Sequence, residues 1–278
     1  MSAIDYLLIG HMTADLTPEG RRLGGTVSYA ARTAHAFGLR VGVLTSAAVN
    51  EPLLDEIRPY AEVVSLEAEA TSTFENIYTP EGRQQYIRGV ANKITVADIP
   101  EVWRTTPYVH LAPLTGEVDP DIVFAFPNAT KLLTLQGWLR YWEDDGLVQF
   151  KRFYDEHVLS ALDIVVFSEE DIREAPDMEA QYAAVVKNLI VTRAAHGGTY
   201  YHQGQPFNYS TPQVEEVNPT GAGDVFASAL LAALSHVGGD MHKALQVAAQ
   251  LGAIAVTRFF LEGAPTPDEV QKTLMEIR

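Results

Sequence analysis

One short stretch of the chain combines residues that could do chemistry, the pentapeptide TGAGD at 220–224. Apolar side chains recur at helical spacing over 226–237, which predicts a helix that begins near Gly221. The first amides of a helix point out of its positive end, and glycine lets a phosphate oxygen approach them closely. A transferring phosphoryl group could therefore be held by the amides of Gly221, Ala222 and Gly223.

Asp224 follows in the first turn of the same predicted helix, for which Thr220 is the expected N-cap. The pattern leaves two interpretations of this carboxylate open. It could simply complement the helix dipole, as acidic residues at helix starts often do. Alternatively, it could act as a general base that accepts a proton from a substrate hydroxyl, while the neighbouring amides stabilise charge on the phosphoryl group.

The composition excludes several other classes of function. The 278 residues carry a formal charge of −16 and no basic run, which argues against nucleic acid or an anionic membrane as partner. There are no cysteines, so disulfides and thiolate metal sites are excluded. We recognise neither a signal peptide nor a membrane-spanning stretch, and expect a cytoplasmic location. The sequence also lacks a P-loop, and its histidines show no metal-ligand spacing.

Short apolar runs alternate with helical patterns along the chain. Continuous apolarity predicts strands buried on both faces at 6–10, 40–46, 108–113, 131–136, 163–168 and 188–193. Helical patterns fall at 26–38, 145–161, 177–186 and 221–237. This alternation predicts an α/β protein with a mainly parallel central sheet, formed as a single domain over 1–278.

A different pattern at 72–89 predicts a β-hairpin, with two alternating strands joined around Pro80, Glu81 and Gly82. Together with a second polar stretch at 13–25, it could cover one end of the main sheet. We therefore expect a small β lid, inserted in the domain and built from about 13–23 and 72–90.

The segment VNPTGAGDVFASALL, 217–231, closely resembles the carboxy-side motif of the ribokinase-like (PfkB) carbohydrate and nucleoside kinases. This resemblance implies a ribokinase-like three-layer sandwich with a β lid. It also implies an anion hole formed by the Gly-Ala-Gly amides, with Asp224 as the base that activates the acceptor hydroxyl.

Further segments resemble the same family in the same order along the chain. LGGTVSYAARTAHAFGLRVGVLT, 23–45, matches the amino-side motif, and Asp15 stands where relatives bind substrate hydroxyls. VVFSEEDI, 165–172, VTRAAHGG, 191–198, and the stretch 248–270 match the nucleotide side. The resemblance implies these site residues: Asp15, Gly24, Gly25 and Tyr29 for the acceptor; Ser168, Thr192, Arg193, Gly197 and Gly252 for the nucleotide; Asp171 for magnesium, held through water.

Several positions depart from the family pattern. Asn218 and Pro219 replace the usual Asp-Thr, which weakens the case for a potassium site, and Ala194 replaces a glycine of the nucleotide turn. Tyr29 replaces an asparagine that sugar kinases use for their substrate. In LQGWLRYW, 135–142, Gln136 and Arg140 occupy positions that bind substrate in relatives, although a surface arginine is an equally good interpretation.

The resemblance implies an ATP- and Mg²⁺-dependent kinase that phosphorylates a hydroxyl of a sugar or of a cyclitol such as inositol. Two alternatives stay open: a nucleoside kinase, and a ligand-binding member of the same fold without catalysis. Relatives often dimerise through lid strands, and the exposed edge of the predicted hairpin is compatible with a homodimer of this kind.

Overall fold

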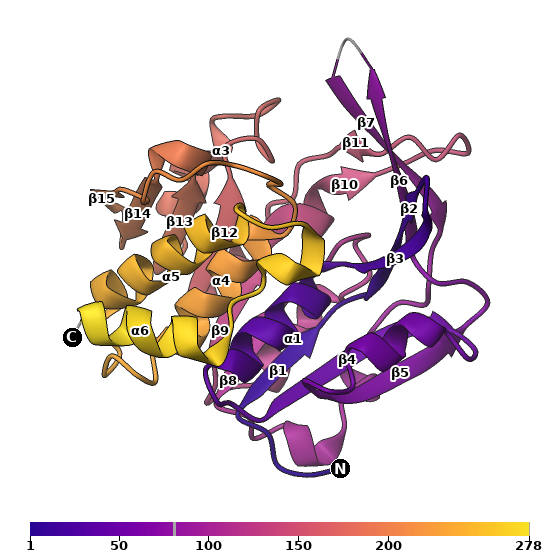
Figure 1. The fold of residues 1–278 in the computed structure, drawn as a ribbon, viewed down its shortest axis with the longest axis horizontal. Helices are drawn as coiled ribbons and strands as arrows, with labels where there is room; N and C mark the ends of the chain where they lie inside the picture. The colour runs from indigo at the N-terminus through magenta and orange to yellow at the C-terminus, as the bar shows by residue number, and fades with distance from the viewer. Residues whose placement is uncertain (80–81, 278) are drawn as a thin grey trace.

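The computed structural model describes residues 1–79 and 82–277, and its centre is a nine-stranded sheet (Figure 1). The strand order is β15-β14-β13-β12-β9-β8-β1-β4-β5. All neighbouring strands from β13 to β5 pair in parallel, whereas at the other end β14 pairs antiparallel with both β13 and β15. The strands of this sheet are β1 Tyr6–Ile9, β4 Val41–Ala48, β5 Glu62–Ala68, β8 Tyr108–Leu111, β9 Thr130–Thr134, β12 Ile164–Ser168, β13 Asn188–Thr192, β14 Gly198–His202 and β15 Gln205–Tyr209. The predicted α/β class and all six predicted strands are confirmed.

Helices cover both faces of the sheet, which gives three layers. Alternate residues of β1 enter two different cores: Leu8 packs with the face covered by α1, α4, α5 and α6, and Leu7 with the face covered by α2, α3 and several short 3₁₀ helices. This two-sided burial explains the continuous apolar runs of the sequence. The helices are α1 Thr26–Ala36, α2 Glu156–Ser160, α3 Met178–Ala183, α4 Ala222–Ala233, α5 Met241–Ala255 and α6 Pro267–Ile277. Among the residues that the structure describes, no helix has both the length and the apolarity needed to cross a membrane.

A second, four-stranded sheet stands apart from the first, with the order β3-β2-β6-β7 (Figure 1). Its strands are β2 Thr13–Thr17, β3 Gly20–Gly24, β6 Thr73–Thr79 and β7 Gly82–Gly89. The predicted hairpin is confirmed, because β6 and β7 pair antiparallel, and β2 joins them by parallel pairing with β6. Of the predicted turn residues, Pro80 and Glu81 lie outside the described residues. We call these four strands the small sheet.

The helix predicted over 145–161 is wrong for most of its length. Only Glu156–Ser160 is helical, and the residues before it pair with other strands. The carbonyl of Gly146, a residue at φ 78°, accepts a hydrogen bond from the amide of Ile87 in β7, and the amide of Val148 donates to the carbonyl of Gln85. β11 Gln149–Phe150 then pairs with β10 Arg140–Tyr141. The mixed-charge sequence is therefore an extended segment along the small sheet, because its backbone partners there outcompete a local helix.

The carboxy-terminal region contains more regular structure than the sequence patterns predicted. The hairpin of β14 and β15 extends the sheet beyond β13, and α5 begins at Met241, capped by the side chain of Asp240. The segment 248–270, compared above with a last helix and its loop, holds the end of α5 and the start of a further helix, α6. α5 packs against α4 in the same hydrophobic core, including the first turns of α4.

Candidate active site

The start of α4 is shaped by a glycine in the left-handed conformation. Gly221 has φ 84° and is the N-cap, so the prediction that Thr220 caps the helix is wrong. Asn218 stabilises the turn before the helix, because its side-chain oxygen accepts a hydrogen bond from the amide of Thr220 at 2.9 Å. A Cβ atom on Gly221 would lie 2.1 Å from the ring of Tyr29. The backbone here therefore requires glycine, both for its φ angle and for the space that the ring occupies.

Ala222, Gly223 and Asp224 form the first turn of α4. Gly223 is exposed, and a Cβ atom on it would meet nothing within 4 Å, so this side of the turn is open to a ligand. The amide of Ala222 donates to the carbonyl of Pro219 at 3.2 Å. The start of the helix thus presents its backbone to open space beside a carboxylate, with the Ala222 amide engaged in the turn.

Asp224 is held by a residue from another helix. The hydroxyl of Thr26, the first residue of α1, donates to Oδ1 of Asp224 at 2.7 Å. Burial raises the pKa of Asp224 to about 6, while the Thr26 hydrogen bond and the charge of Arg140 oppose that rise and the charges of Asp171 and Asp15 add to it. A carboxyl group with this pKa is ionised near neutral pH and still basic enough to take a proton from a hydroxyl.

The acceptor-side residues predicted from the sequence lie next to this carboxylate. A Cβ on Gly24 would be 2.4 Å from Oδ2 of Asp15, so the Asp15 side chain of β2 lies directly against the backbone of β3. Gly25, at φ 85°, is the N-cap of α1. Tyr29 is buried, and burial followed by the charges of Asp224 and Asp15 raises the pKa of its hydroxyl. These residues therefore lie together at the amino ends of α1 and α4.

Gln136 and Arg140 lie in the segment after β9, near the carboxylates of the site. Nε2 of Gln136 donates to Oδ1 of Asp171 at 3.4 Å, and Nη1 of Arg140 donates to the carbonyl of Leu114 at 3.4 Å. The Arg140 guanidinium also lies over the ring of Phe74 in β6, 5.7 Å from its centroid. Because its charge acts on Asp224, Arg140 faces the site and is not an isolated surface arginine.

The donor-side residues cluster at the ends of β12 and β13. Ser168 and Thr192 are register partners on these parallel strands, so both stand at the same edge of the sheet. Oδ2 of Asp171 accepts hydrogen bonds from both the amide and the hydroxyl of Ser168, each at 2.8 Å. Among residues 1–79 and 82–277, no group of three His, Cys, Asp or Glu side chains is placed to hold a metal ion directly.

Arg193 is committed to ion pairs within the protein. Its Nη2 donates to both carboxylate oxygens of Glu179, at 2.6 and 2.8 Å, and its Nε lies 3.4 Å from Glu169. The nearby Gly197 has φ 82°, and a Cβ there would be 2.0 Å from the carbonyl oxygen of Tyr209, so glycine is required. Ala194 keeps a positive φ of 45°, the conformation that the glycine it replaces would adopt more easily.

Gly252 lies in α5 against the start of α4. A Cβ on this glycine would be 3.5 Å from the Cβ of Phe226 and 3.7 Å from the carbonyl oxygen of Ala222, which is ordinary contact distance. Gly252 therefore belongs to the packing of α5 against α4 in this structure.

Two groups of functional interest were missed by sequence reasoning. The only sequence feature that could have marked Thr26 as functional is its position directly after the Gly24-Gly25 pair. Glu117, which is 2% exposed, accepts the amides of His11, Leu114 and Thr115 at 2.8, 2.9 and 2.7 Å. Nothing in its polar sequence neighbourhood marks it as a residue that ties together the loops after β1 and β8.

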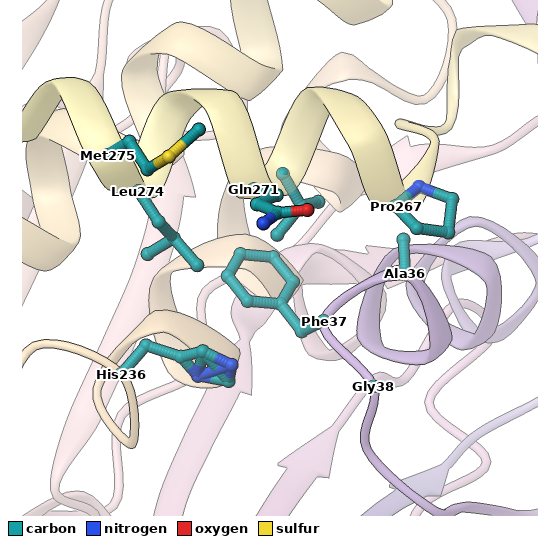
Figure 2. Close-up of a pocket in the computed structure, with 9 residues that line it drawn as sticks. Ala36, Phe37, Gly38, His236, Pro267, Gln271, Leu274 and Met275 are labelled. Carbon is teal, nitrogen blue, oxygen red and sulfur yellow. The ribbon is translucent and has the colours of Figure 1, made fainter.

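The cavity in Figure 2, of about 340 Å³, is remote from this site. It lies between α6 and the carboxy end of α1, where Phe37 and Leu274 face each other. The candidate site is at the amino end of the same helix, which has 11 residues and therefore spans roughly 16 Å. The cavity and the candidate site are thus on opposite ends of α1.

Replacing Gly221 with alanine should destabilise the protein by about 2 kcal/mol, because the side chain would need a left-handed backbone and would overlap the Tyr29 ring. Chemical denaturation measures this change. The matched variant is Gly223→Ala in the same turn, where the Cβ meets nothing and the stability should be unchanged or higher by up to about 1 kcal/mol. Equal stability of the two variants would show that the tight contact at Gly221 is not present.

Comparison with known proteins finds similarity to carbohydrate and nucleoside kinases. Residues 148–266 match the model of the pfkB family of carbohydrate kinases. The chain is 28% identical over 185 residues to a fructokinase of Escherichia coli, covering 59% of each protein, and thus spans less than two thirds of that relative. It is 26% identical over 255 residues to a cytidine kinase of Thermococcus kodakarensis, covering 84% of this chain and 89% of that protein.

Solved structures share the whole fold at low sequence identity. A pyrophosphate-dependent myo-inositol-1 kinase converted into a myo-inositol-3 kinase superposes with a TM-score of 0.80 at 20% identity, covering 98% of both chains. A ribokinase of Thermotoga maritima gives 0.75 at 18% identity, covering 98% of this chain and 99% of that one. The chain thus resembles pfkB-family carbohydrate kinases over residues 148–266, and it has the ribokinase-like fold.

Proposed function

We propose that the protein transfers a phosphoryl group to a hydroxyl of a small polyhydroxy compound, a sugar or a cyclitol such as inositol. The observation that carries this proposal is the placement of Asp224, hydrogen bonded to Thr26 in the first turn of α4 and surrounded by Asp15, Tyr29 and Arg140. A carboxylate that only complemented a helix dipole would need no such surroundings. The match of residues 148–266 to the model of the pfkB family of carbohydrate kinases supports the same reaction class.

In the proposed reaction Asp224 accepts the proton of the acceptor hydroxyl. The freed oxygen forms a bond to the terminal phosphorus of the donor, and the bond from that phosphorus to the bridging oxygen breaks, so that the rest of the donor leaves, as ADP when the donor is ATP. The amides of Gly221 and Gly223 stabilise charge on the transferring group. The amide of Ala222 can join them only by giving up its 3.2 Å bond to Pro219.

ATP is the donor that we propose, and one electrostatic observation favours it over pyrophosphate. A nucleotide gains affinity through its base as well as its phosphates, whereas pyrophosphate has only its charge to bind by. Arg193, the cation that the sequence placed on the donor side, is neutralised by Glu179 and Glu169. This leaves less positive charge for a donor without a base.

The residues on the donor side fit a magnesium ion held through water. Oδ2 of Asp171 accepts a hydrogen bond from Ser168, and its Oδ1 accepts one from Gln136. Because both oxygens already have partners, the carboxylate would bind a hydrated Mg²⁺ through its water ligands more easily than it would coordinate the ion directly. Mg²⁺, when bound, neutralises charge on the donor phosphates. Ser168, Thr192 and Gly197 would line the donor, while Asp15, Gly24, Gly25, Tyr29, Gln136 and Arg140 would orient the acceptor.

The test is a panel of sugars, inositols and nucleosides, each assayed with ATP and with pyrophosphate in the presence of Mg²⁺. We expect ADP to form with a sugar or a cyclitol, because Asp15 and Arg140 together suit several hydroxyls better than a flat base. Phosphorus NMR of the product identifies the phosphorylated hydroxyl. Turnover confined to nucleosides would show that the proposed acceptor is wrong, and turnover only with pyrophosphate would show that the proposed donor is wrong. Binding without any turnover would favour a non-catalytic member of the fold.

A further inference from the structure

Asp224 is approached by the amino ends of two different helices. It lies in the first turn of α4, and Thr26 is the first residue of α1. The Thr26 side chain is almost completely buried, 2% exposed, and its hydroxyl donates to Oδ1 of Asp224 at 2.7 Å. The two residues are 198 positions apart in the chain, so this contact depends on the packing of α1 against α4.

Thr26 differs from the other buried hydroxyl residues of α1. Ser28 donates to the carbonyl of Gly24 at 2.6 Å and Thr33 to the carbonyl of Tyr29 at 2.9 Å, each four residues back. Such bonds to the backbone are the usual fate of hydroxyls within a helix. Thr26 stands at the first position, where no preceding helical turn offers a carbonyl, so its single proton is available for Asp224.

We propose that Thr26 is a positioning residue, which occupies Oδ1 of Asp224 and thereby leaves Oδ2 as the atom that takes the proton of the acceptor hydroxyl. The inference rests on the proposed function, since it specifies how the proposed base is held. Threonine suits this task because its branched side chain has few rotamers and is packed in place. A fixed carboxylate needs no reorientation when the acceptor binds.

The hydrogen bond also acts on the charge of the base. Arg140 favours the ionised form of Asp224, whereas Asp15 and Asp171 disfavour it, and the ring of Tyr29 lies against Gly221 beside it. Thr26 is the one neutral group among these that donates directly to the carboxylate. Removing its proton donor should therefore make Asp224 harder to ionise and raise its pKa above about 6.

The experiment compares Thr26→Val with Thr33→Val, the same change in the same helix at a hydroxyl that bonds only to the backbone. Thr26→Val should move the acidic limb of the kcat/KM profile upward by about one pH unit and lower kcat/KM at pH 6 by about fivefold. Thr33→Val should leave the midpoint where it is. Thr26→Ser, which keeps the hydroxyl, should restore both the midpoint and most of the rate.

Carbon NMR of aspartate-labelled protein gives the same comparison without turnover. The Asp224 carboxyl, assigned by its loss in Asp224→Asn, should titrate at higher pH in Thr26→Val than in wild type or Thr26→Ser. An unchanged titration in folded Thr26→Val, or the same shift in Thr33→Val, would overturn the inference. An NMR shift in a protein that phosphorylates no acceptor would sink the proposed function and leave the Thr26–Asp224 contact standing.

Discussion

Replacing Asp224 with asparagine should lower kcat by about 10²–10⁴-fold, the range that general base catalysis contributes. Asparagine keeps the size of the side chain and can still accept from Thr26, but it cannot take a proton. Donor binding should persist, because the amides of the α4 start are unchanged, and titration calorimetry with the nucleotide checks this. A variant that retained full activity would return Asp224 to the simpler role of complementing the helix dipole.

Asp268 supplies the matched control. It also lies in the first turn of a helix, α6, but it is exposed and far from the site. If Asp224 served only the helix dipole, Asp224→Asn and Asp268→Asn should behave alike. We expect Asp268→Asn to have wild-type activity.

The raised pKa of Asp224 also fixes the sign of two pH effects. Wild-type activity should fall as the pH drops below about 6, where burial of the carboxyl leads to its protonation. A carboxyl whose folded pKa lies above its unfolded value costs stability once ionised, so the wild type loses stability as the pH rises from about 4 to about 6. Asp224→Asn should therefore be at least as stable as wild type at pH 7, which separates lost chemistry from misfolding.

Replacing Glu117 with alanine should lower the free energy of unfolding by roughly 3–9 kcal/mol. Three buried amides, those of His11, Leu114 and Thr115, would each lose their acceptor, at about 1–3 kcal/mol apiece. Glu117→Gln keeps the volume and should cost less, so it remains measurable if the alanine variant does not fold. Chemical denaturation gives the values.

The control for Glu117 is Glu101→Gln, which removes an exposed ion pair with Arg104 and should leave stability unchanged. Burial tends to raise the pKa of Glu117, but the charge of His11 and the donated amide bonds outweigh it and hold the pKa below the ordinary value. The stabilisation is thus present above about pH 4.5 and is lost as the pH falls through the lowered pKa. Equal acid sensitivity of wild type and Glu117→Gln would contradict this account.

The sequence was informative wherever a structure depends on local pattern. Strands buried on both faces give continuous apolar runs, so β1, β4, β8, β9, β12 and β13 were predictable, as was the start of α4 within one residue. The residues around Asp224 also came together as the family resemblance implied, including Asp15 and Arg140.

Features that depend on distant partners were not predictable. The segment 146–148 is extended because its backbone bonds to β7, about 60 residues earlier, and no local pattern encodes that partner. Gly221 replaces Thr220 as N-cap because the Tyr29 ring and the Asn218 turn fix the backbone there. The hydrogen bond from Thr26 to Asp224 of α4 was not predictable, because no residue spacing within α1 indicates a partner in another helix.

The small sheet has a consequence for how such an enzyme can diverge. It enters the chain as two insertions, one between β1 and α1 and the other between β5 and β8. The main sheet is complete without it, since β1 pairs directly with both β4 and β8. Natural selection can therefore alter the strands that carry Asp15 and Phe74 while the register beneath Asp224 stays intact. The small sheet is in this sense structurally separate, so the strand that carries Asp15, the proposed acceptor ligand, belongs to a different sheet from the strands that carry the proposed donor residues Ser168 and Thr192.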